Sequence, residues 1–342
     1  MDMKKIGRQT VRFPSPPAIV GFGSAVGTKE GQGPLGQCFD FVGKDDSFGE
    51  KSWEKAETAM QKKALSFALK KAGIQTGQLD YILAGDLLNQ CIATSYSLRS
   101  QNVPFFGLYG ACSTMAESLS LGAMLVDGGF ANYVAALTSS HFCSAERQYR
   151  NPLEYGGQKP PTAQWTTTGS GAVILSKKGK GPYITHVTTG KVVDKGITDA
   201  NNMGAAMAPA AYSTLKAHFE ETGREPAFYD LIVTGDLGSL GKEIVIDFFR
   251  RDGVDLSGCY HDCGVLLFDP KTQDVHAGGS GCGCSAVVLT GHLLREFQQG
   301  KLKNLLFCGT GALHSPTSTM QGESVPGICH AVAISTEKGG TQ

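Results

Sequence analysis

A cysteine stands where a short run of small residues leads into an apolar segment. Gly110-Ala111-Cys112-Ser113 precedes a stretch, 113–126, that is apolar or small nearly all round, which is typical of a helix buried on every side. A thiol at a helix N-terminus lies at the positive end of the helix dipole, beside free backbone N–H groups. Cys112 and Ser113 are therefore expected to form a nucleophilic or anion-contacting site. The structural alternative is a small cysteine packed at a tight turn.

A glycine-rich segment leads into a second apolar stretch. Residues 278–285 read Gly-Gly-Ser-Gly-Cys-Gly-Cys-Ser and open a helix expected over 285–298. Such glycines expose backbone N–H groups and let a ligand approach closely. Close packing of two helices explains the same glycines. Gly281 and Cys284 are the residues of this segment that we expect at a ligand.

Imidazole and basic side chains supply further candidates. His141 and His314 each follow the end of an expected strand, where α/β folds place ligand groups; a hydrogen-bonded structural histidine is the alternative. The stretch 142–168 lacks periodicity, and a loop of this length in a compact domain is more often functional than idle. It could equally be a solvated surface loop. Its basic side chains are the expected partners of a carboxylate: Arg147, Arg150 and Lys159.

Two other kinds of site are disfavoured. The spacings in the cysteine and histidine cluster differ from those of zinc ribbons and fingers, so we expect no metal and no cofactor. That cluster consists of Cys259, His261, Cys263, Cys282 and Cys284. A glycine-rich segment at 21–27 hints at dinucleotide binding, but the glycines and proline at 31–34 prevent the helix that must follow.

The chain contains two copies of one unit. The segment 79–87 recurs at 229–237, so that Asp236 lies 150 residues after Asp86. Two further matches keep the same order: Cys112-Ser113 with Cys284-Ser285, and Ser140-His141 with Leu313-His314. A period of this length far exceeds that of solenoid repeats and indicates a duplicated domain. The predicted halves are residues 1–178, with the long loop 142–168, and residues 179–342.

Helix and strand patterns alternate in both halves. Helices are expected at 53–73, 113–126, 205–221 and 285–298, and strands at 80–85, 132–138, 171–176, 183–189, 231–234, 304–308 and 329–335. Such alternation predicts an α/β protein with mixed sheets covered by helices. Two units packed about a pseudo-twofold axis would enclose their all-apolar helices between the sheets.

Composition limits the function classes. The 342 residues carry 31 basic and 31 acidic side chains, which argues against nucleic acid or a strongly anionic membrane as the main partner, because both demand a basic surplus. No run approaches the ~20 apolar residues of a membrane span, and no apolar segment with a cleavage site follows the basic N-terminus. The ten irregularly spaced cysteines are interpreted as reduced thiols.

The duplicated unit, the cysteine before the buried helix and the glycine-rich entry to its mate resemble the thiolase superfamily, the condensing enzymes of acyl chemistry. Finer motifs resemble the stage V sporulation protein AD family of endospore-forming bacteria. These motifs span nearly the whole chain: Gly31–Gly36, Leu83–Gln90, Gly110–Thr114, Ala145–Gln148, Glu154–Pro160 and Gly311–Pro316.

The resemblance implies a thiolase-like α/β fold of duplicated αβα units packed as five layers (αβαβα). It also implies binding of dipicolinic acid (pyridine-2,6-dicarboxylate), as the calcium chelate, and support of its uptake into the developing spore. The protein would work as a peripheral protein at the spore inner membrane, beside membrane proteins of the same operon, with a role that extends to germination. A homodimer is expected by the same resemblance.

The sequence departs from the catalytic members of the superfamily. Cys112 stands where they keep the acylated nucleophile, but the second half lacks the His, and the His or Asn, that activate it. Gly235 or Asp236 occupies one of these places, and residues 280–284 contain neither His nor Asn. Without a base the thiol loses its activation.

The first hypothesis is therefore a non-catalytic binding protein in which two helix N-termini converge on one cleft. Its expected ligand-binding residues are Cys112, Ser113, His141, Arg147, Gly281, Cys284 and His314. The alternatives are an active acyltransferase or condensing enzyme with Cys112 as nucleophile, and a scaffold with an empty pocket.

Overall fold

Fourteen strands and eleven α-helices are present in the computed structural model, which describes residues 4–149 and 159–339. The strands are β1 (Thr10–Arg12), β2 (Ala18–Val26), β3 (Phe41–Val42), β4 (Tyr81–Gly85), β5 (Phe105–Gly107), β6 (Tyr133–Ser140), β7 (Trp165–Thr166), β8 (Gly169–Ser176), β9 (Tyr183–Thr188), β10 (Leu231–Thr234), β11 (Tyr260–Asp262), β12 (Gly279–Ser280), β13 (Asn304–Ala312) and β14 (Gly327–Ser335). The helices are α1 (Thr28–Gly31), α2 (Trp53–Ala72), α3 (Ile92–Leu98), α4 (Thr114–Asp127), α5 (Phe142–Tyr149), α6 (Met203–Thr222), α7 (Gly238–Arg251), α8 (Cys263–Leu267), α9 (Cys282–Val288), α10 (Leu294–Gln298) and α11 (Pro316–Met320).

The two halves of the chain have the same strand order. The first half runs β2-β8-β6-β4-β5 and the second runs β9-β14-β13-β10-β11. They join where Ala18 of β2 pairs with Tyr183 of β9, which makes one twelve-stranded sheet together with β1 and β3. The predicted boundary after residue 178 falls between the end of β8 and the start of β9.

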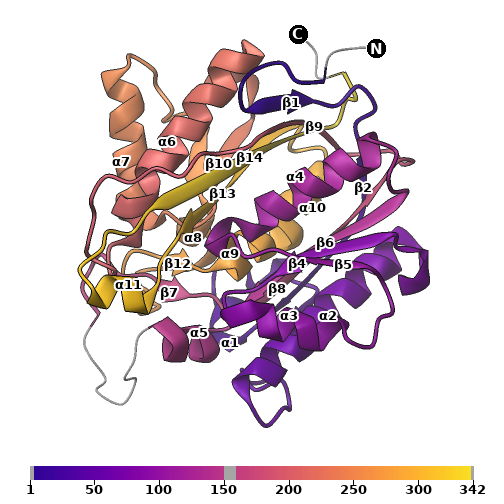
Figure 1. Ribbon diagram of the computed structural model, residues 1–342, viewed down its shortest axis with the longest axis horizontal. Helices are drawn as coiled ribbons and strands as arrows, with labels where there is room; N and C mark the ends of the chain where they lie inside the picture. Colours follow the sequence, from indigo (N-terminus) through magenta and orange to yellow (C-terminus); the bar gives the residue numbers. More distant parts are fainter. Residues whose placement is uncertain (1–3, 150–158, 340–342) are drawn as a thin grey trace.

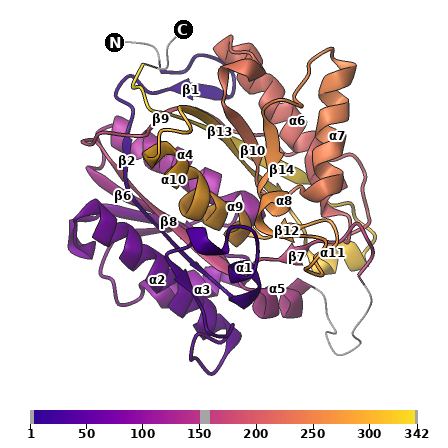
Figure 2. The same ribbon diagram turned by 180° about the vertical axis from the view of Figure 1, so that it is seen from behind.

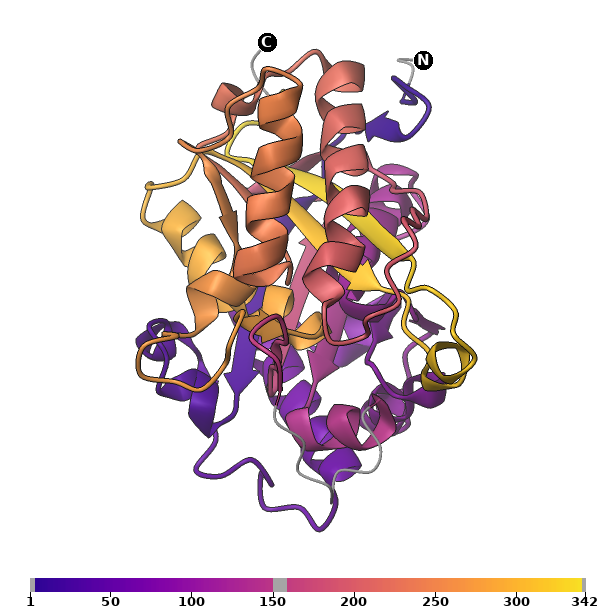
Figure 3. The same cartoon turned by 90° about the vertical axis from the view of Figure 1, so that its left-hand side faces the viewer.

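Helices separate and cover the two halves of this sheet. Helices α2 and α3 lie on the outer face of the first half, and α6 and α7 lie on the outer face of the second (Figures 1 and 3). Helices α4, α9 and α10 lie between the halves, as the view from behind also shows (Figure 2). One hydrophobic cluster fills the central space, with Leu119 from α4 and Val287 from α9, and two further clusters lie under the outer helices. The five-layer thiolase-like arrangement is therefore confirmed.

The long helices begin and end at matching signals in both halves. The Ser52 hydroxyl accepts a hydrogen bond from the Lys55 N–H before α2, and the Asn202 side chain accepts one from the Ala205 N–H before α6. Gly73 and Gly223 end these helices in the left-handed conformation, as C-terminal glycines commonly do. The helix predictions at 53–73, 113–126 and 205–221 are confirmed.

The expected long loop at 142–168 is partly wrong. Its first eight residues form α5, and Trp165–Thr166 form β7, which pairs with β12 of the second half. Phe142 stacks on Trp165 with ring centroids 3.9 Å apart, so tertiary packing orders a segment that shows no periodicity. The expected elements also omit α7. Arg150, expected at a carboxylate, lies outside the described residues.

Candidate functional site

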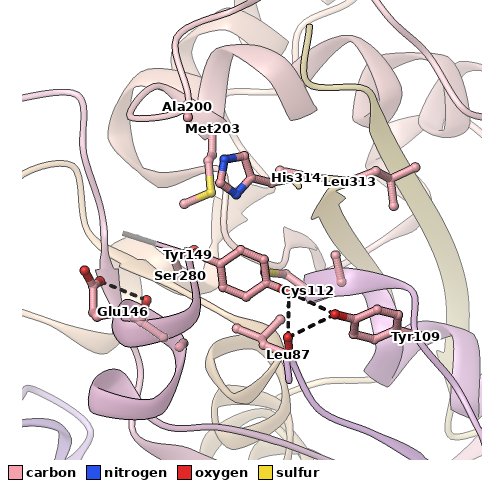
Figure 4. A pocket seen from close by; sticks show the side chains of 14 residues that line it. Leu87, Tyr109, Cys112, Glu146, Tyr149, Ala200, Met203, Ser280, Leu313 and His314 are labelled. Atoms are coloured by element: carbon pink, nitrogen blue, oxygen red, sulfur yellow. Dashed lines mark hydrogen bonds between the residues drawn. The ribbon is translucent and has the colours of Figure 1, made fainter. Parts of the chain in front are cut away.

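A cavity of about 230 Å³ lies where the two halves meet (Figure 4). Its polar and aromatic lining comes from both halves of the chain, and Leu87, Met203 and Leu313 add apolar surface. The polar, aromatic and thiol side chains that line it are those of Tyr109, Cys112, Glu146, Tyr149, Thr166, Ser280 and His314.

Cys112 reaches the cavity from the turn that leads into α4. Ala111 has a φ of +51°, a conformation that costs a non-glycine residue free energy and tends to occur at functional sites. Cys112 is only 7% exposed and lines the cavity wall. The Ser113 hydroxyl instead donates to the carbonyl oxygen of Gly110 at 2.7 Å, so this side chain turns back on its own turn.

Asp236 lies behind Cys112, at the end of β10. Its side chain is fully buried. One carboxylate oxygen accepts a hydrogen bond from the Thr310 hydroxyl at 2.7 Å. The other accepts from the Gly281 N–H at 3.1 Å and the Ser280 hydroxyl at 3.2 Å. The anion at the start of α9 is therefore the protein's own carboxylate. Burial raises the pKa of Asp236 to about 6.

The thiol of Cys112 lies beside this carboxylate. Burial raises the pKa of the Cys112 thiol well above its ordinary value, and the negative charge of Asp236 raises it further. The Gly281 N–H has a smaller, opposite effect. Of the two residues expected at the place of the missing base, Asp236 is the one beside the sulfur. An acidic neighbour disfavours the thiolate, which is the nucleophilic form.

Aromatic side chains line the cavity beside Cys112. The Tyr149 hydroxyl donates to the carbonyl oxygen of Leu87 at 2.6 Å and lies 3.1 Å from the Tyr109 hydroxyl. The ring of His314 lies 5.6 Å from that of Tyr149, tilted by 41°. Figure 4 shows Tyr149 between His314 and the Leu87 carbonyl. These hydroxyl and imidazole groups can hydrogen-bond a polar ligand whose flat face packs on the rings.

One acidic side chain also lines the cavity. Glu146 is 3% exposed and forms an ion pair with Lys159 at 3.2 Å. The Thr166 hydroxyl lies 3.4 Å from the same carboxylate oxygen. Lys159 also lies over the rings of Phe142 and Trp165. Lys159 therefore lies at the edge of the cavity, where its ammonium group pairs with the Glu146 carboxylate.

Of the expected ligand-binding residues, Cys112 and His314 line the cavity. Gly281 lies behind the cavity wall, where its N–H donates to Asp236. His141 lies elsewhere: its Nε2 is 2.8 Å from the Asp46 carbonyl oxygen, and its Nδ1 accepts a hydrogen bond from the Cys143 N–H. Burial lowers the pKa of His141, so this ring is a neutral, fully hydrogen-bonded structural histidine.

Arg147 and Cys284 also lie away from the cavity. Arg147 is on the outer side of α5 and forms an ion pair with Glu54, because Glu146 and Tyr149 occupy the side of the helix that faces the cavity. Cys284 is fully buried in the central hydrophobic cluster with Cys263. Two residues along a helix point in nearly opposite directions, and Cys282, not Cys284, packs beside Cys112.

Several lining residues were not expected from the sequence. Tyr109 and Tyr149 had no periodic or motif signal. Glu146 lies in the family motif Ala145–Gln148, but it was not predicted as a site residue because α5 itself was not predicted. Asp236 carried a signal, because it matches Asp86 in the repeat. In the described parts of the chain, no three His, Cys, Asp or Glu side chains converge as a metal site would require.

Comparisons with known proteins identify the family of the chain and its fold separately. The sequence profile of the stage V sporulation protein AD family matches residues 7–335. The chain is 47% identical over 332 residues to stage V sporulation protein AD of Bacillus subtilis strain 168, covering 97% of this chain and 98% of that protein.

Solved structures of condensing enzymes share the fold at low identity. 3-Oxoacyl-[acyl-carrier-protein] synthase III from Aquifex aeolicus matches with a TM-score of 0.56 and 13% identity, over 93% of this chain and 99% of that one. A variant of OleA from Xanthomonas campestris matches with a TM-score of 0.59 and 14% identity, over 95% and 99%. The fold is that of these enzymes, but the profile match and the 47% identity show that the chain belongs to the stage V sporulation protein AD family.

Proposed function

We propose that this chain is a non-catalytic binding protein whose cavity takes dipicolinate. The observation that carries the proposal is the pairing of Cys112 with Asp236, where a condensing enzyme needs a base. Burial and the neighbouring carboxylate both disfavour the thiolate and so keep the thiol protonated. The remaining features of the cavity are those of a binding site: it is small, partly apolar and lined by few polar groups.

The cavity offers separate partners to each part of the ligand. Backbone N–H groups at the start of α4 favour one carboxylate by roughly 0.3–1 kcal/mol, and by up to ~2 kcal/mol when partly buried. The His314 imidazole and the Tyr109 hydroxyl can donate to the other, and the ring of Tyr149 matches the face of a pyridine. Glu146 offers a carboxylate oxygen to the calcium of the chelate, and calcium prefers oxygen ligands. Contacts of this kind support micromolar-to-millimolar affinity.

Membership of a sporulation family suggests the process in which the proposed binding acts. We propose that the protein supports the uptake of dipicolinate into the developing spore. It would act at the spore inner membrane beside the other proteins of its operon, with a later role in germination. Among the described helices, none has the length and apolarity to cross a bilayer, so the proposed attachment is peripheral.

A homodimer is part of the same proposal. Strand β5 ends the sheet, and Phe105 and Phe106 on it are 37% and 50% exposed. An exposed hydrophobic edge strand pairs readily with another strand. A second copy of β5 would cover this edge.

Calorimetry tests the binding. The wild-type chain should bind dipicolinate with and without calcium, and His314→Ala and Cys112→Ala should each weaken binding about tenfold. Arg147→Ala is the matched control, because Arg147 lies outside the cavity, and it should bind like wild type. Absence of binding by the wild-type chain, or equal binding by all four proteins, contradicts the proposal.

The position of Cys112 on the cavity wall favours one alternative, an acyltransferase that uses this thiol. Incubation with acyl-CoA followed by mass spectrometry distinguishes the two. An acyl adduct on Cys112 would support the enzyme, whereas the paired thiol and Asp236 predict an unmodified protein.

A further inference from the structure

The outer face of α2 is a positively charged stripe. Lys55, Lys62, Lys63 and Lys70 are all exposed. At 100° per residue these positions fall within about a quarter of the helix circumference, over a length of about 22 Å. The residues between them on this face, Ala59 and Ser66, are small, so the stripe is flat as well as basic.

No acidic side chain neutralises this stripe. Across residues 4–149 and 159–339, none of the four lysines forms an ion pair; Lys63 lies over the Phe41 ring at 4.3 Å. The two glutamates of α2 are occupied elsewhere, Glu54 with Arg147 and Glu57 in the interior. Because the whole chain has no net charge, the stripe is a local concentration of positive charge.

The chemistry of the stripe favours a lipid surface. All four cations are lysines, whose compact ammonium groups suit diffuse attraction, whereas bidentate recognition of a single phosphate uses arginine. A row of exposed lysines on one face of a helix fits the headgroups of an anionic bilayer.

We propose that the outer face of α2 docks on an anionic phospholipid membrane through Lys55, Lys62, Lys63 and Lys70. This inference rests on the proposed membrane location and supplies its contact surface. It does not depend on the cavity, because the stripe lies on the outside of the first layer whereas the cavity lies at the junction of the halves (Figure 1).

Vesicle co-sedimentation of the purified full chain tests the proposal. The wild-type protein should bind phosphatidylcholine vesicles that contain one-third phosphatidylglycerol, should not bind pure phosphatidylcholine vesicles, and should be released by raised salt. Each lysine near such a surface contributes about a fivefold increase in affinity. Lys55→Gln, Lys62→Gln, Lys63→Gln and Lys70→Gln combined should therefore weaken binding several-hundred-fold. Glutamine keeps helix propensity close to that of lysine, so the fold should be retained.

A control variant that loses four lysines elsewhere tests whether the position of the lysines matters or only the net charge of the protein. Lys178, Lys180, Lys191 and Lys195 are exposed and lie outside α2. Changing these four to Gln should leave most of the vesicle binding intact. The proposal is overturned if both quadruple variants lose vesicle binding equally. It is also overturned if the wild-type protein does not bind bare anionic vesicles and needs a membrane protein for recruitment. Calorimetry with dipicolinate on the α2 variant should match wild type, so failure of lipid docking and failure of ligand binding give different results.

Discussion

The thiol of Cys112 and the carboxylate of Asp236 lie side by side at the junction of the two halves of the chain. Cys112 comes from the turn before α4, and Asp236 follows β10. Asp236 is held from three directions by Thr310, Ser280 and Gly281. These three hydrogen bonds fix the carboxylate in its position beside the thiol.

Asp236→Asn should make Cys112 more reactive. Asparagine keeps the shape of the side chain but removes the charge that raises the thiol pKa, and loss of one close like charge lowers a pKa by about one unit or more. Alkylation of Cys112 by iodoacetamide near pH 8 should become about tenfold faster, as measured by mass spectrometry of the cysteine-containing peptide. Cys112→Ala is the control for labelling elsewhere. An unchanged rate would show that burial alone sets the reactivity.

Glu146→Gln should have opposite effects on the binding of calcium-free dipicolinate and of its calcium chelate. Removing this negative charge from the cavity wall should tighten binding of calcium-free dipicolinate, because a like charge near its carboxylates is lost. It should also remove the gain in affinity that calcium gives. Titration calorimetry with and without calcium measures both effects, and Glu54→Gln, outside the cavity, should show neither. A calcium effect that survives in Glu146→Gln would place the metal elsewhere.

Glu57 should make stability depend on pH. It is 1% exposed, accepts hydrogen bonds from Ser139 and Ser144, and lies near the buried Asp86. Burial, followed by the Asp86 charge, raises the pKa of Glu57 to about 8, above the ~4.3 of an unfolded chain. The folded protein therefore holds a proton that the unfolded chain releases. The stability from this group is complete below about pH 4 and is lost as pH rises toward 8.

Glu57→Gln should flatten that dependence. Thermal unfolding between pH 5 and pH 9 should show a wild-type melting temperature that falls with rising pH, and a smaller fall in the variant. Glu50→Gln, at an exposed position, should melt with the wild-type pH profile. Parallel profiles for wild type and Glu57→Gln would mean that Glu57 is ionised in the folded protein.

Gly281→Ala should destabilise the junction strongly. Gly281 has a φ of +95°, and a Cβ there would lie 2.6 Å from the Ser140 Oγ. The combined cost of the backbone conformation and the overlap is about 3 kcal/mol in the free energy of unfolding. Gly77→Ala is the matched control, because a Cβ there meets nothing within 4 Å. Denaturant titration of both variants gives the comparison, and a loss below about 1 kcal/mol at position 281 would show that the loop relaxes.

Phe106→Glu should disrupt the proposed homodimer. A charge on β5 would lie in the interface between two edge strands, where its desolvation is unfavourable. Light scattering should report a dimer for wild type and a monomer for this variant. Phe130→Glu, at a residue that is 72% exposed and outside β5, should remain dimeric. A wild-type monomer, or a dimer in both variants, would remove β5 from the interface.

Repetition within the sequence determined much of the fold. The match of 79–87 with 229–237 corresponds to the equivalent strands β4 and β10. The first apolar segment forms α4, and the second, predicted as one helix over 285–298, forms α9, a π-helical turn at Leu289–Leu293 and α10. These features can be predicted from the sequence because a helix buried on all sides is apolar nearly all round, and a duplicated strand repeats its residue types. Cys112 and the glycine-rich segment were identified for the same reason.

Only the tertiary structure decided which side chains meet at the cavity. Helix α5 spans only Phe142–Tyr149, which is shorter than the window over which helical periodicity is read. The sequence therefore could not show that Glu146 and Tyr149 face inward while Arg147 faces out. Likewise, the sequence alone did not show whether Gly235 or Asp236 takes the place of the missing base. Which of them lies beside the Cys112 sulfur depends on how two halves, 150 residues apart in their repeat, pack against each other.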